Sequence, residues 1–534
     1  MAARLFQLAA FWAITGFSHA DASLCSSNTF ADVIPSNSTI TYATDITANS
    51  TFGDSHAMTN ATSLPEGCAI GVEVPSSGNS SYHLALFLPS EKHWNSRFIT
   101  VGNAGYAGFT AWKDIGVYAQ YGFAALSTNT GHDGGFDSST WALNKESLTD
   151  WGWRAMHGSV VIGKDLVKAY YSQAAKYSYY SGCSTGGRQG LKEIQMFPDD
   201  FDGAFVGAPA WWVVHLGLWT SVANLPNLPQ NSSHHISSTL ASAITDEIIR
   251  QCDPQDGVTD NVVMEPYSCR FNPNTLLCSP SSNTTNCLQP AQMTTLHKAL
   301  NDWVDDGQTF VFPAPALGAS ISSWLGDSAT PSSMGTGYIQ NMLLNTTAAY
   351  DWTAFNYSMV QLSEAVDPGR ATPDAYDLSA FRARGGKLLH YHGMADPVVP
   401  FGSSLYFYDQ VAQAMVPKGV DVDDFYRFFP IAGMGHCDTS GYAPYYIAGC
   451  TQYLTGATHG VPGFDGAEHD GILALMRWVE NGTAPEKLVA TKYQDDMPAK
   501  GVESQRPVCP YPLQTKYKGG EVADPASWAC ESLY

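Results

Sequence analysis

The amino-acid sequence predicts an α/β protein whose parallel β-sheet is interrupted by one large insertion. Two observations support this. Short apolar segments alternate with helix-length segments near both ends of the chain, and the stretch between them loses that alternation. Strands that alternate with helices pair in parallel, because each helix returns the chain to the same edge of the sheet. We therefore expect a core built from residues 21–207 and 381–534, with a lid formed by residues 208–380.

The first half of the chain supplies most of the expected sheet. Strands are predicted at His83–Leu88, Arg97–Val101, Gly122–Ser127 and Tyr177–Tyr180, and helices at Trp151–Tyr171 and Arg188–Met196. These strands are short, rich in apolar or aromatic residues and bounded by turn-forming residues. Residues 21–80 are rich in Ser, Thr and Asn, and we expect them to form mainly loops.

The expected lid differs in composition from the core. It contains four cysteines, five prolines between Pro226 and Pro273, and little periodicity. The alternation then returns, with strands predicted at Gly386–His392 and Tyr426–Ile431 and a helix at Gly471–Asn481. The lid is therefore expected to be an insertion between two strands of one sheet.

The overall charge excludes some functions. The chain has 534 residues, of which 44% are hydrophobic and 14% charged, with a formal net charge of −22. Phosphates would be repelled by such a surface, which argues against nucleic acid and against anionic membranes as partners.

The N-terminus predicts secretion. Arg4 precedes the apolar run 5–17, and Ser18-His19-Ala20 offers small residues where a signal peptidase cleaves, so we expect residues 1–20 to be a signal peptide. An ordinary apolar N-terminal helix is the alternative. Nine N-glycosylation sequons agree with a eukaryotic, extracellular protein: Asn37, Asn49, Asn60, Asn79, Asn231, Asn283, Asn345, Asn356 and Asn481.

All eleven cysteines follow Ala20: Cys25, Cys68, Cys183, Cys252, Cys269, Cys278, Cys287, Cys437, Cys450, Cys509 and Cys530. In an oxidising compartment most of them should form disulfides, and the odd count leaves at least one without a partner in the chain.

A candidate nucleophile lies between a predicted strand and a predicted helix. Gly182-Cys183-Ser184-Thr185-Gly186 fits the pattern G-x-S-x-G, in which a sharp turn presents a serine hydroxyl and glycines permit the close backbone approach. The pattern alone is weak evidence, and a glycine-rich turn without chemistry is the alternative. Its position after a strand favours a nucleophile.

The partners of such a serine should follow in the order acid, then histidine, each after a later strand. Asp396 and His436 meet both conditions. A turn-forming Asp-Pro and an ordinary loop histidine are the alternatives. We expect His436 to take the proton of Ser184 and Asp396 to orient the imidazole. The backbone N–H of Thr185, and one from the glycine-rich loop, for which we choose Gly105, should stabilise the oxyanion.

Two cysteines adjoin this triad. Cys183 precedes Ser184 and Cys437 follows His436, so contact between serine and histidine would bring the two thiols together. We expect a Cys183–Cys437 disulfide; two unrelated buried thiols are the alternative.

The pattern Cys183-Ser184, Asp396 and His436-Cys437 resembles the tannase and feruloyl esterase family of secreted fungal esterases. Gly182–Gly187 and Thr130-Gly131-His132 are similar to further signatures of that family. The resemblance covers nearly the whole mature chain. It implies an α/β-hydrolase fold with a large lid and substrates that are esters of phenolic acids. Asn103 and Ala104 interrupt a loop that is usually richer in glycine in the family, which leaves the second oxyanion donor open.

The resemblance, with sequence proximity, also implies the remaining disulfides: Cys25–Cys68, Cys252–Cys269, Cys278–Cys287 and Cys509–Cys530, with Cys450 unpaired.

The segment from Asp253 to Val262 is a candidate metal site. Carboxylates and carbonyls suit calcium, although the spacing differs from an EF-hand and a solvated acidic turn is the alternative. The family resemblance implies a structural Ca²⁺ ion held by the side chains of Asp253, Asp256 and Asp260 and the carbonyls of Val258 and Val262.

The resemblance favours a secreted feruloyl esterase that cleaves ferulate, caffeate or p-coumarate esters of plant cell-wall saccharides. A tannase, which cleaves gallate esters, is the nearest alternative. A catalytically inactive binding protein on the same scaffold is another, opposed by the intact triad. A lipase or peptidase is disfavoured by the resemblance, and a lipase also because no long apolar lid helix is evident.

Overall fold

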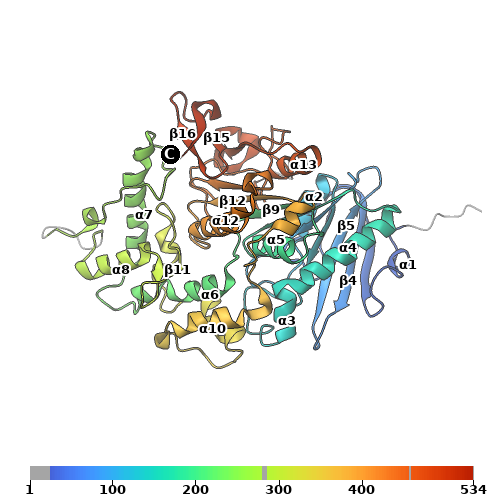
Figure 1. The fold of residues 1–534 in the computed structure, drawn as a ribbon, viewed down its shortest axis with the longest axis horizontal. Coiled ribbons are helices and arrows are strands. Elements are labelled where there is room, and N and C mark those ends of the chain that lie inside the picture. Colours follow the sequence, from blue (N-terminus) through green and yellow to red (C-terminus); the bar gives the residue numbers. More distant parts are fainter. Residues whose placement is uncertain (1–23, 280–285, 456–458, 533–534) are drawn as a thin grey trace, which may run out of the picture.

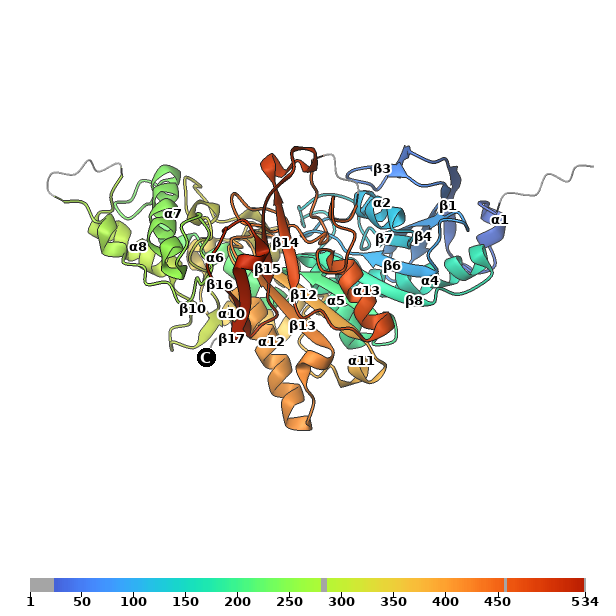
Figure 2. The same ribbon diagram turned by 90° about the horizontal axis from the view of Figure 1, so that it is seen from above.

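A computed structural model describes residues 24–279, 286–455 and 459–532. The predicted signal peptide and the Asn283 sequon lie outside these residues. The main sheet and its helices form one body, and the lid extends from one side of it (Figures 1 and 2). None of the helices in the described ranges is both long and apolar enough to cross a membrane.

The main sheet has nine strands within the described residues, in the order β1-β4-β5-β7-β6-β8-β9-β12-β13. Neighbours among β1, β4, β5 and β7 pair antiparallel, and the pairs from β7 through β6 to β13 are parallel. This mixed sheet with helices on both faces is the α/β-hydrolase fold. The strands are β1 (Thr39–Ile46), β4 (Gly67–Pro75), β5 (Ser81–Pro89), β6 (Arg97–Val101), β7 (Ala124–Thr128), β8 (Tyr177–Cys183), β9 (Gly203–Gly207), β12 (Lys387–Gly393) and β13 (Tyr426–Ile431).

The N-terminal segment is more regular than its composition predicted. Residues 21–80 contain β1 and β4 of the main sheet and the hairpin of β2 (Ser50–Phe52) and β3 (Ala61–Leu64). The expectation of mainly loops was wrong because threonine is β-branched and suits a pleated strand as well as a loop. Since β1 lies at the sheet edge with one neighbour, it remains partly exposed and tolerates polar residues.

Helices cover both faces of the sheet. One core cluster includes buried residues of α4 (Ala155–Tyr171), α5 (Thr185–Met196) and α12 (Gly402–Met415). A second cluster includes those of α2 (Trp112–Gln120) and α13 (Gly471–Asn481). The predicted helix from Trp151 begins with a π-helical turn, Asp150–Arg154, and α5 begins three residues earlier than predicted. As a result, α5 starts directly after Ser184.

The lid is formed by the residues between β9 and β12. No strand in the described part of that segment pairs with the main sheet. Within the described residues, its helices of eight or more residues are α6 (Val213–Val222), α7 (Ser238–Cys252), α8 (Pro290–Leu300) and α10 (Ser358–Val366). The lid also contains the short helix α9 (Ser333–Gly337) and a hairpin of β10 (Trp303–Val304) and β11 (Phe310–Phe312). Leucines and isoleucines of α7 and α8 form a separate buried cluster. The lid therefore has a hydrophobic core of its own.

The C-terminal segment forms two hairpins beside the lid, one of β14 (Leu488–Tyr493) with β15 (Val502–Val508) and one of β16 (Leu513–Tyr517) with β17 (Trp528–Ser532). Arg506 pairs with Asp260 at 2.6 Å and Lys516 with Glu265 at 2.8 Å. These ion pairs join the acidic lid loop to the C-terminal end of the chain.

All five expected disulfides are present: Cys25–Cys68, Cys183–Cys437, Cys252–Cys269, Cys278–Cys287 and Cys509–Cys530. Cys450 is free and buried, as expected.

Helices α4 and α5 are joined by a histidine between two carboxylates. His157 Nδ1 lies 2.7 Å from Asp200 Oδ2 and 3.8 Å from Glu193 Oε2, and its ring stacks on Phe197. Burial alone would lower the pKa of His157, but the hydrogen bonds and charges of Asp200 and Glu193 raise it to about 9.

The pH dependence of stability tests this contact. Because the pKa is raised in the folded state, the stabilisation by His157 is fully present below its unfolded value, about 6.5, and is lost as the pH rises through about 9. We expect His157→Gln to lower the free energy of unfolding by up to about 3 kcal/mol at pH 6 and by much less at pH 9.5. Denaturant unfolding measures both values, with His297→Gln, exposed on α8, as control. An equal loss at both pH values would contradict the assignment.

Candidate active site

Ser184 occupies the turn between β8 and α5. Its backbone has φ 62° and ψ −124°, a left-handed conformation that is costly for a residue other than glycine. A Cβ added at Gly182 would lie 2.6 Å from a backbone atom of Gly186, so the turn requires glycine there. This is the geometry of a nucleophile elbow, with the serine held clear of the strand.

Asp396 and His436 meet at the ends of neighbouring parallel strands. Asp396 follows β12, His436 follows β13, and His436 Nδ1 lies 2.7 Å from Asp396 Oδ2. Since a carboxylate only accepts, Nδ1–H donates, which leaves Nε2 as the nitrogen that can accept a proton.

The electrostatics of the pair favour an ionised carboxylate. Burial alone would raise the pKa of Asp396, but the neighbouring His436 and the hydrogen bond from His392 hold it well below its usual range. Burial alone would lower the pKa of His436, and the charge of Asp396 raises it overall. Asp396 therefore remains charged and stabilises the imidazolium form of His436.

A buried chain of hydrogen bonds continues behind Asp396. His392 Nε2 lies 3.0 Å from Asp396 Oδ2, and Ser404 Oγ lies 2.7 Å from His392 Nδ1 and 3.0 Å from His390 Nε2. Tyr426 lies 2.8 Å from His390 Nδ1. Because Asp396 only accepts, His392 Nε2–H donates to it. His392 Nδ1 then accepts from the Ser404 hydroxyl, Ser404 Oγ accepts from His390 Nε2–H, and His390 Nδ1 accepts from the Tyr426 hydroxyl.

His392 was not among the site residues predicted from the sequence. A histidine at the end of a strand, four residues before the candidate acid, was the available signal.

The Cys183–Cys437 disulfide joins the serine turn to the histidine loop. The two Cα atoms lie 6.0 Å apart, although 254 residues separate the cysteines in sequence. Ser184 and His436 are the adjacent residues, so the bridge keeps their loops together.

Ser184 lines a cavity of about 410 Å³ between the core and the lid. Thr185 and Gly105 line the same cavity, and the lid contributes Trp219, Trp324 and Met334. As the first residue of α5, Thr185 has a backbone N–H without an intrahelical partner. Asn103 donates its backbone N–H to Gln189 Oε1 at 2.9 Å and is thereby engaged elsewhere.

Four polar atoms of residues that line the cavity are buried and have no hydrogen-bond partner: Asn224 Oδ1, Trp324 Nε1, Trp151 Nε1 and Arg188 Nε. Buried polar atoms without partners are rare in proteins, and in a binding cavity they point to polar groups of a ligand. Trp219 of the lid lines this cavity, whereas Trp211 stacks on Trp212 outside it. Trp324 and Trp151 were not anticipated as cavity residues.

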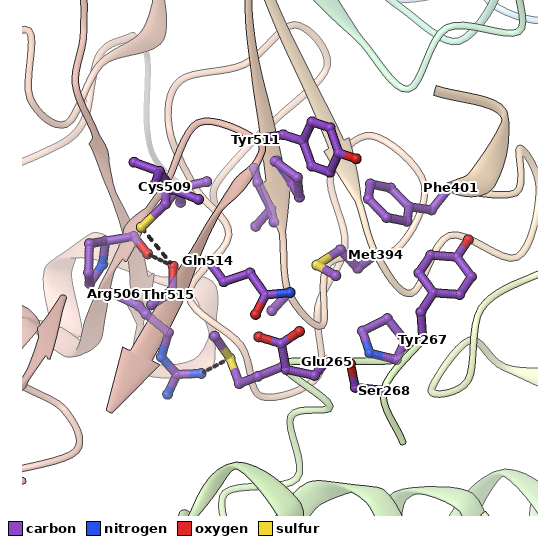
Figure 3. A pocket seen from close by; sticks show the side chains of 18 of the residues that line it. Glu265, Tyr267, Ser268, Met394, Phe401, Arg506, Cys509, Tyr511, Gln514 and Thr515 are labelled. Carbon is purple, nitrogen blue, oxygen red and sulfur yellow. Dashed lines mark hydrogen bonds between the residues drawn. The ribbon is translucent and has the colours of Figure 1, made fainter. Parts of the chain in front are cut away.

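A second cavity, of about 350 Å³, lies where the lid meets the C-terminal hairpins (Figure 3). Tyr267, Phe401 and Tyr511 surround it, with Glu265 and Gln514 among its polar residues. Ser184 lines the first cavity and is not among the lining residues of the second, so we place the candidate active site in the first cavity.

The residues of the expected calcium site lie in one loop of the lid. Asp253 accepts backbone N–H groups of Asp260 and Asn261 at 3.1 and 2.9 Å, and Asp260 also pairs with Arg506. Asp256 Oδ2 is buried without a hydrogen-bond partner. A carboxylate oxygen left unpaired beside two further aspartates fits a hard cation. The residues present therefore suit calcium.

Comparisons with known proteins show the family of this chain. A family model described as tannase and feruloyl esterase matches residues 69–531. A probable feruloyl esterase B-1 of Aspergillus oryzae is 34% identical over 469 residues, which cover 87% of this chain and 83% of that protein. Feruloyl esterase B of Aspergillus niger is 34% identical over 471 residues, which cover 87% and 86%.

Solved structures extend the likeness to the fold. The crystal structure of feruloyl esterase B from Aspergillus oryzae has a TM-score of 0.87 at 32% identity and covers 95% of this chain and 99% of that one. Tannin acyl hydrolase from Aspergillus niger shares the fold, with a TM-score of 0.74 at 22% identity, and covers 95% of both chains. This chain belongs to the tannase and feruloyl esterase family and is a carboxylic ester hydrolase.

Proposed function

We propose that this esterase hydrolyses hydroxycinnamate esters, such as feruloyl, caffeoyl or p-coumaroyl groups on plant cell-wall saccharides, through an acyl-enzyme. The observation that carries the proposal is the cavity that Ser184 shares with tryptophans of the lid. The likeness to proteins named feruloyl esterase B supports the substrate class.

The reaction follows from the roles of the three residues, of which His436 and Asp396 are in direct contact. His436 Nε2 accepts the Ser184 proton while Ser184 Oγ attacks the ester carbonyl, and the imidazolium is stabilised by Asp396 at 2.7 Å. His436 then returns the proton to the leaving alcohol. In the second half of the reaction, water attacks the acyl-enzyme with the same base and frees the acid.

The oxyanion requires two N–H donors near Ser184. Thr185 at the start of α5 is the first donor, because its N–H has no intrahelical acceptor and the helix N-terminus favours negative charge. Gly105 is our choice for the second, since it lines the cavity and its φ of 52° suits glycine.

The walls of the cavity suit a cinnamoyl group. Trp219, Leu216 and Val213 offer apolar surface for the ring and its two-carbon extension. Asn224 Oδ1 can accept a phenolic hydroxyl, and Trp324 Nε1 can donate to a hydroxyl or methoxy oxygen. The three hydroxyls of gallate want more polar partners, and a site built for gallate would reject analogues that lack them.

A tannase remains the second candidate, because hydroxyls of the lid segment Ser328, Thr330 and Ser332 also line the cavity. An inactive binding protein is disfavoured by the intact Asp396–His436 contact beside the strained Ser184 turn.

Calcium would be held by the side chains of Asp253, Asp256 and Asp260 and by the carbonyls of Val258 and Val262. When bound, it would neutralise acidic charge and stabilise the lid without taking part in the reaction. Five disulfides support an oxidising, extracellular location, consistent with the predicted signal peptide.

Replacing the nucleophile tests the mechanism. We expect Ser184→Ala to reduce kcat on a chromogenic acetate ester by at least about a thousandfold with an unchanged melting temperature, because triad members are rarely replaceable. Ser242→Ala, exposed on α7, is the matched control and should keep full activity. Retention of about a tenth of the wild-type kcat by Ser184→Ala would exclude Ser184 as nucleophile.

A substrate panel tests the specificity. We expect kcat/KM for methyl ferulate, methyl caffeate or methyl p-coumarate to exceed that for methyl gallate by about tenfold or more, equivalent to about 1.4 kcal/mol of transition-state binding. A higher kcat/KM for methyl gallate than for every hydroxycinnamate would identify a tannase instead.

Calcium removal tests the lid site. Chelation should lower the melting temperature and added calcium should restore it, because a ligand of the folded state stabilises by mass action. Asp256→Asn should weaken this response. If elemental analysis of the purified protein finds no calcium and chelation leaves the melting temperature unchanged, the calcium proposal is wrong.

A further inference from the structure

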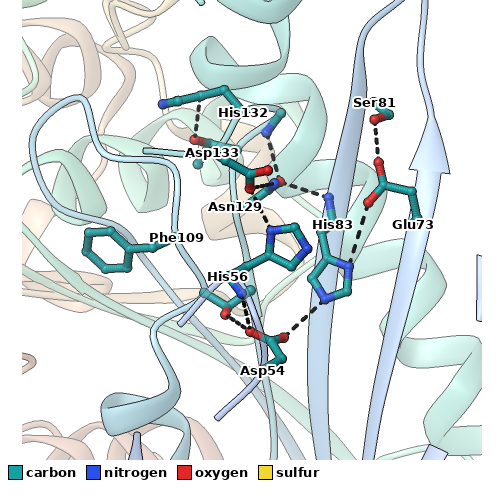
Figure 4. A network of polar contacts seen from close by, with 12 residues as sticks. Asp54, His56, Glu73, Ser81, His83, Phe109, Asn129, His132 and Asp133 are labelled. Carbon is teal, nitrogen blue, oxygen red and sulfur yellow. Dashed lines mark hydrogen bonds and ion pairs between the residues drawn. The ribbon is translucent and has the colours of Figure 1, made fainter. Parts of the chain in front are cut away.

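Two histidines and a glutamate meet on one face of the antiparallel part of the sheet (Figure 4). Glu73 of β4 and His83 of β5 are direct cross-strand partners, and His56 follows β2. One ligand atom from each residue lies within 4.8 Å of the other two. We propose that His56, Glu73 and His83 bind a divalent transition-metal ion of the zinc type, separate from the calcium loop and from the esterase triad.

Each of the three side chains is oriented by a second residue. His83 Nε2 lies 3.1 Å from Asp54 Oδ2, and His56 Nδ1 lies 2.6 Å from Asp133 Oδ1. Glu73 Oε1 accepts the hydroxyl of Ser81. Ligand histidines in metal sites commonly donate their other ring N–H to a carboxylate, and both histidines do so here.

These contacts determine which nitrogens are available. Because Asp54 and Asp133 accept, the neutral rings carry their protons on His83 Nε2 and His56 Nδ1. The lone pairs then lie on His83 Nδ1 and His56 Nε2, and Glu73 Oε2 is the carboxylate oxygen that faces His83.

The distance between His83 and Glu73 suits an ion between them. His83 Nδ1 is buried without a hydrogen-bond partner, and 3.7 Å separates it from Glu73 Oε2. That separation is too long for a hydrogen bond, whereas two ligands about 2.0–2.1 Å from a tetrahedral zinc ion lie roughly 3.4 Å apart.

The donor set and the exposure point to zinc rather than calcium. Two imidazole nitrogens and one carboxylate oxygen suit zinc, whereas calcium takes oxygen ligands. Side-chain exposures of 20% for His56 and 36% for Glu73 provide an entry path and room for a water ligand. The two rings stack with centroids 4.2 Å apart, so the more exposed His56 ring would have to tilt to direct its free nitrogen at an ion shared with His83 and Glu73.

The site would brace a loop that adjoins the active-site cavity. Asp133 follows Thr130-Gly131-His132, and His132 Nε2 donates to the carbonyl of Tyr106 at 2.8 Å. Tyr106 lines the cavity of Ser184. A bound ion would therefore fasten β4, β5 and the His56 segment to a loop that supports the cavity wall, and its role is structural.

Zinc titration of the full chain tests the proposal. The protein is treated with phenanthroline, returned to calcium-containing buffer, and titrated with zinc chloride by calorimetry. We expect one zinc ion per chain and a higher melting temperature with zinc. Glu73→Gln and His56→Gln should weaken the affinity at least about tenfold, and Asp133→Asn, which alters only the orienting carboxylate, about 10–100-fold.

His297→Gln, an exposed histidine of the lid, is the matched control and should bind zinc as the wild type does. Unchanged esterase activity of the metal-free variants verifies that they fold, and Asp133, 71% exposed, can be changed with little risk to the fold. Absence of zinc uptake by the wild type, or equal affinity in Glu73→Gln and His56→Gln, overturns the proposal. Neither result bears on the esterase assignment, which rests on other residues.

Discussion

The carboxylate of Asp396 is fully buried and accepts four hydrogen bonds, and the arrangement of the active site depends on it. The backbone N–H groups of Val398 and Val399 donate to Oδ1, and His392 and His436 donate to Oδ2. A buried charge without such partners would cost several kcal/mol. Here the donors come from β12, from the turn after it and from the loop after β13, so the same bonds that keep the carboxylate ionised also hold those segments together.

The turn at Ser184 is maintained by a different kind of constraint. Its backbone is strained, and strain of this kind persists only where the surrounding structure leaves no alternative. Strand β8, helix α5 and the Cys183–Cys437 bridge supply that surrounding structure. The elbow is covalently tied to the loop that carries His436, so Ser184 and His436 cannot separate widely without movement of both loops.

In the proposed function, the lid contributes recognition and not chemistry. Its buried apolar residues form a core separate from those of the sheet, and its tryptophans Trp219 and Trp324 line the cavity of Ser184. The acidic loop reaches the C-terminal hairpins through Arg506 and Lys516, so the end of the chain fastens the lid to the core. A calcium ion in that loop would act on the lid through the same contacts.

The sequence by itself determined the order of the three candidate catalytic residues along the chain. The nucleophile motif, the acid and the histidine each follow a strand, and this local pattern is visible because strands, turns and glycines leave periodic signals. The five disulfides were also anticipated, partly because Cys183 and Cys437 adjoin residues that must touch. Strands β6 and β13 and helix α13 have the predicted bounds.

The tertiary structure decided what depends on contacts between distant segments. The threonine-rich β1 and its neighbour β4 became strands because β5 offered a partner, which no local signal shows. His392 gained its role from the turn and the helix that follow β12, and Trp151 and Trp324 gained theirs from a cavity that they line together. The His56–Glu73–His83 cluster likewise exists only because β4 pairs with β5 and the loop after β2 folds over them. Such placements depend on the packing of the whole chain, so local sequence patterns do not encode them.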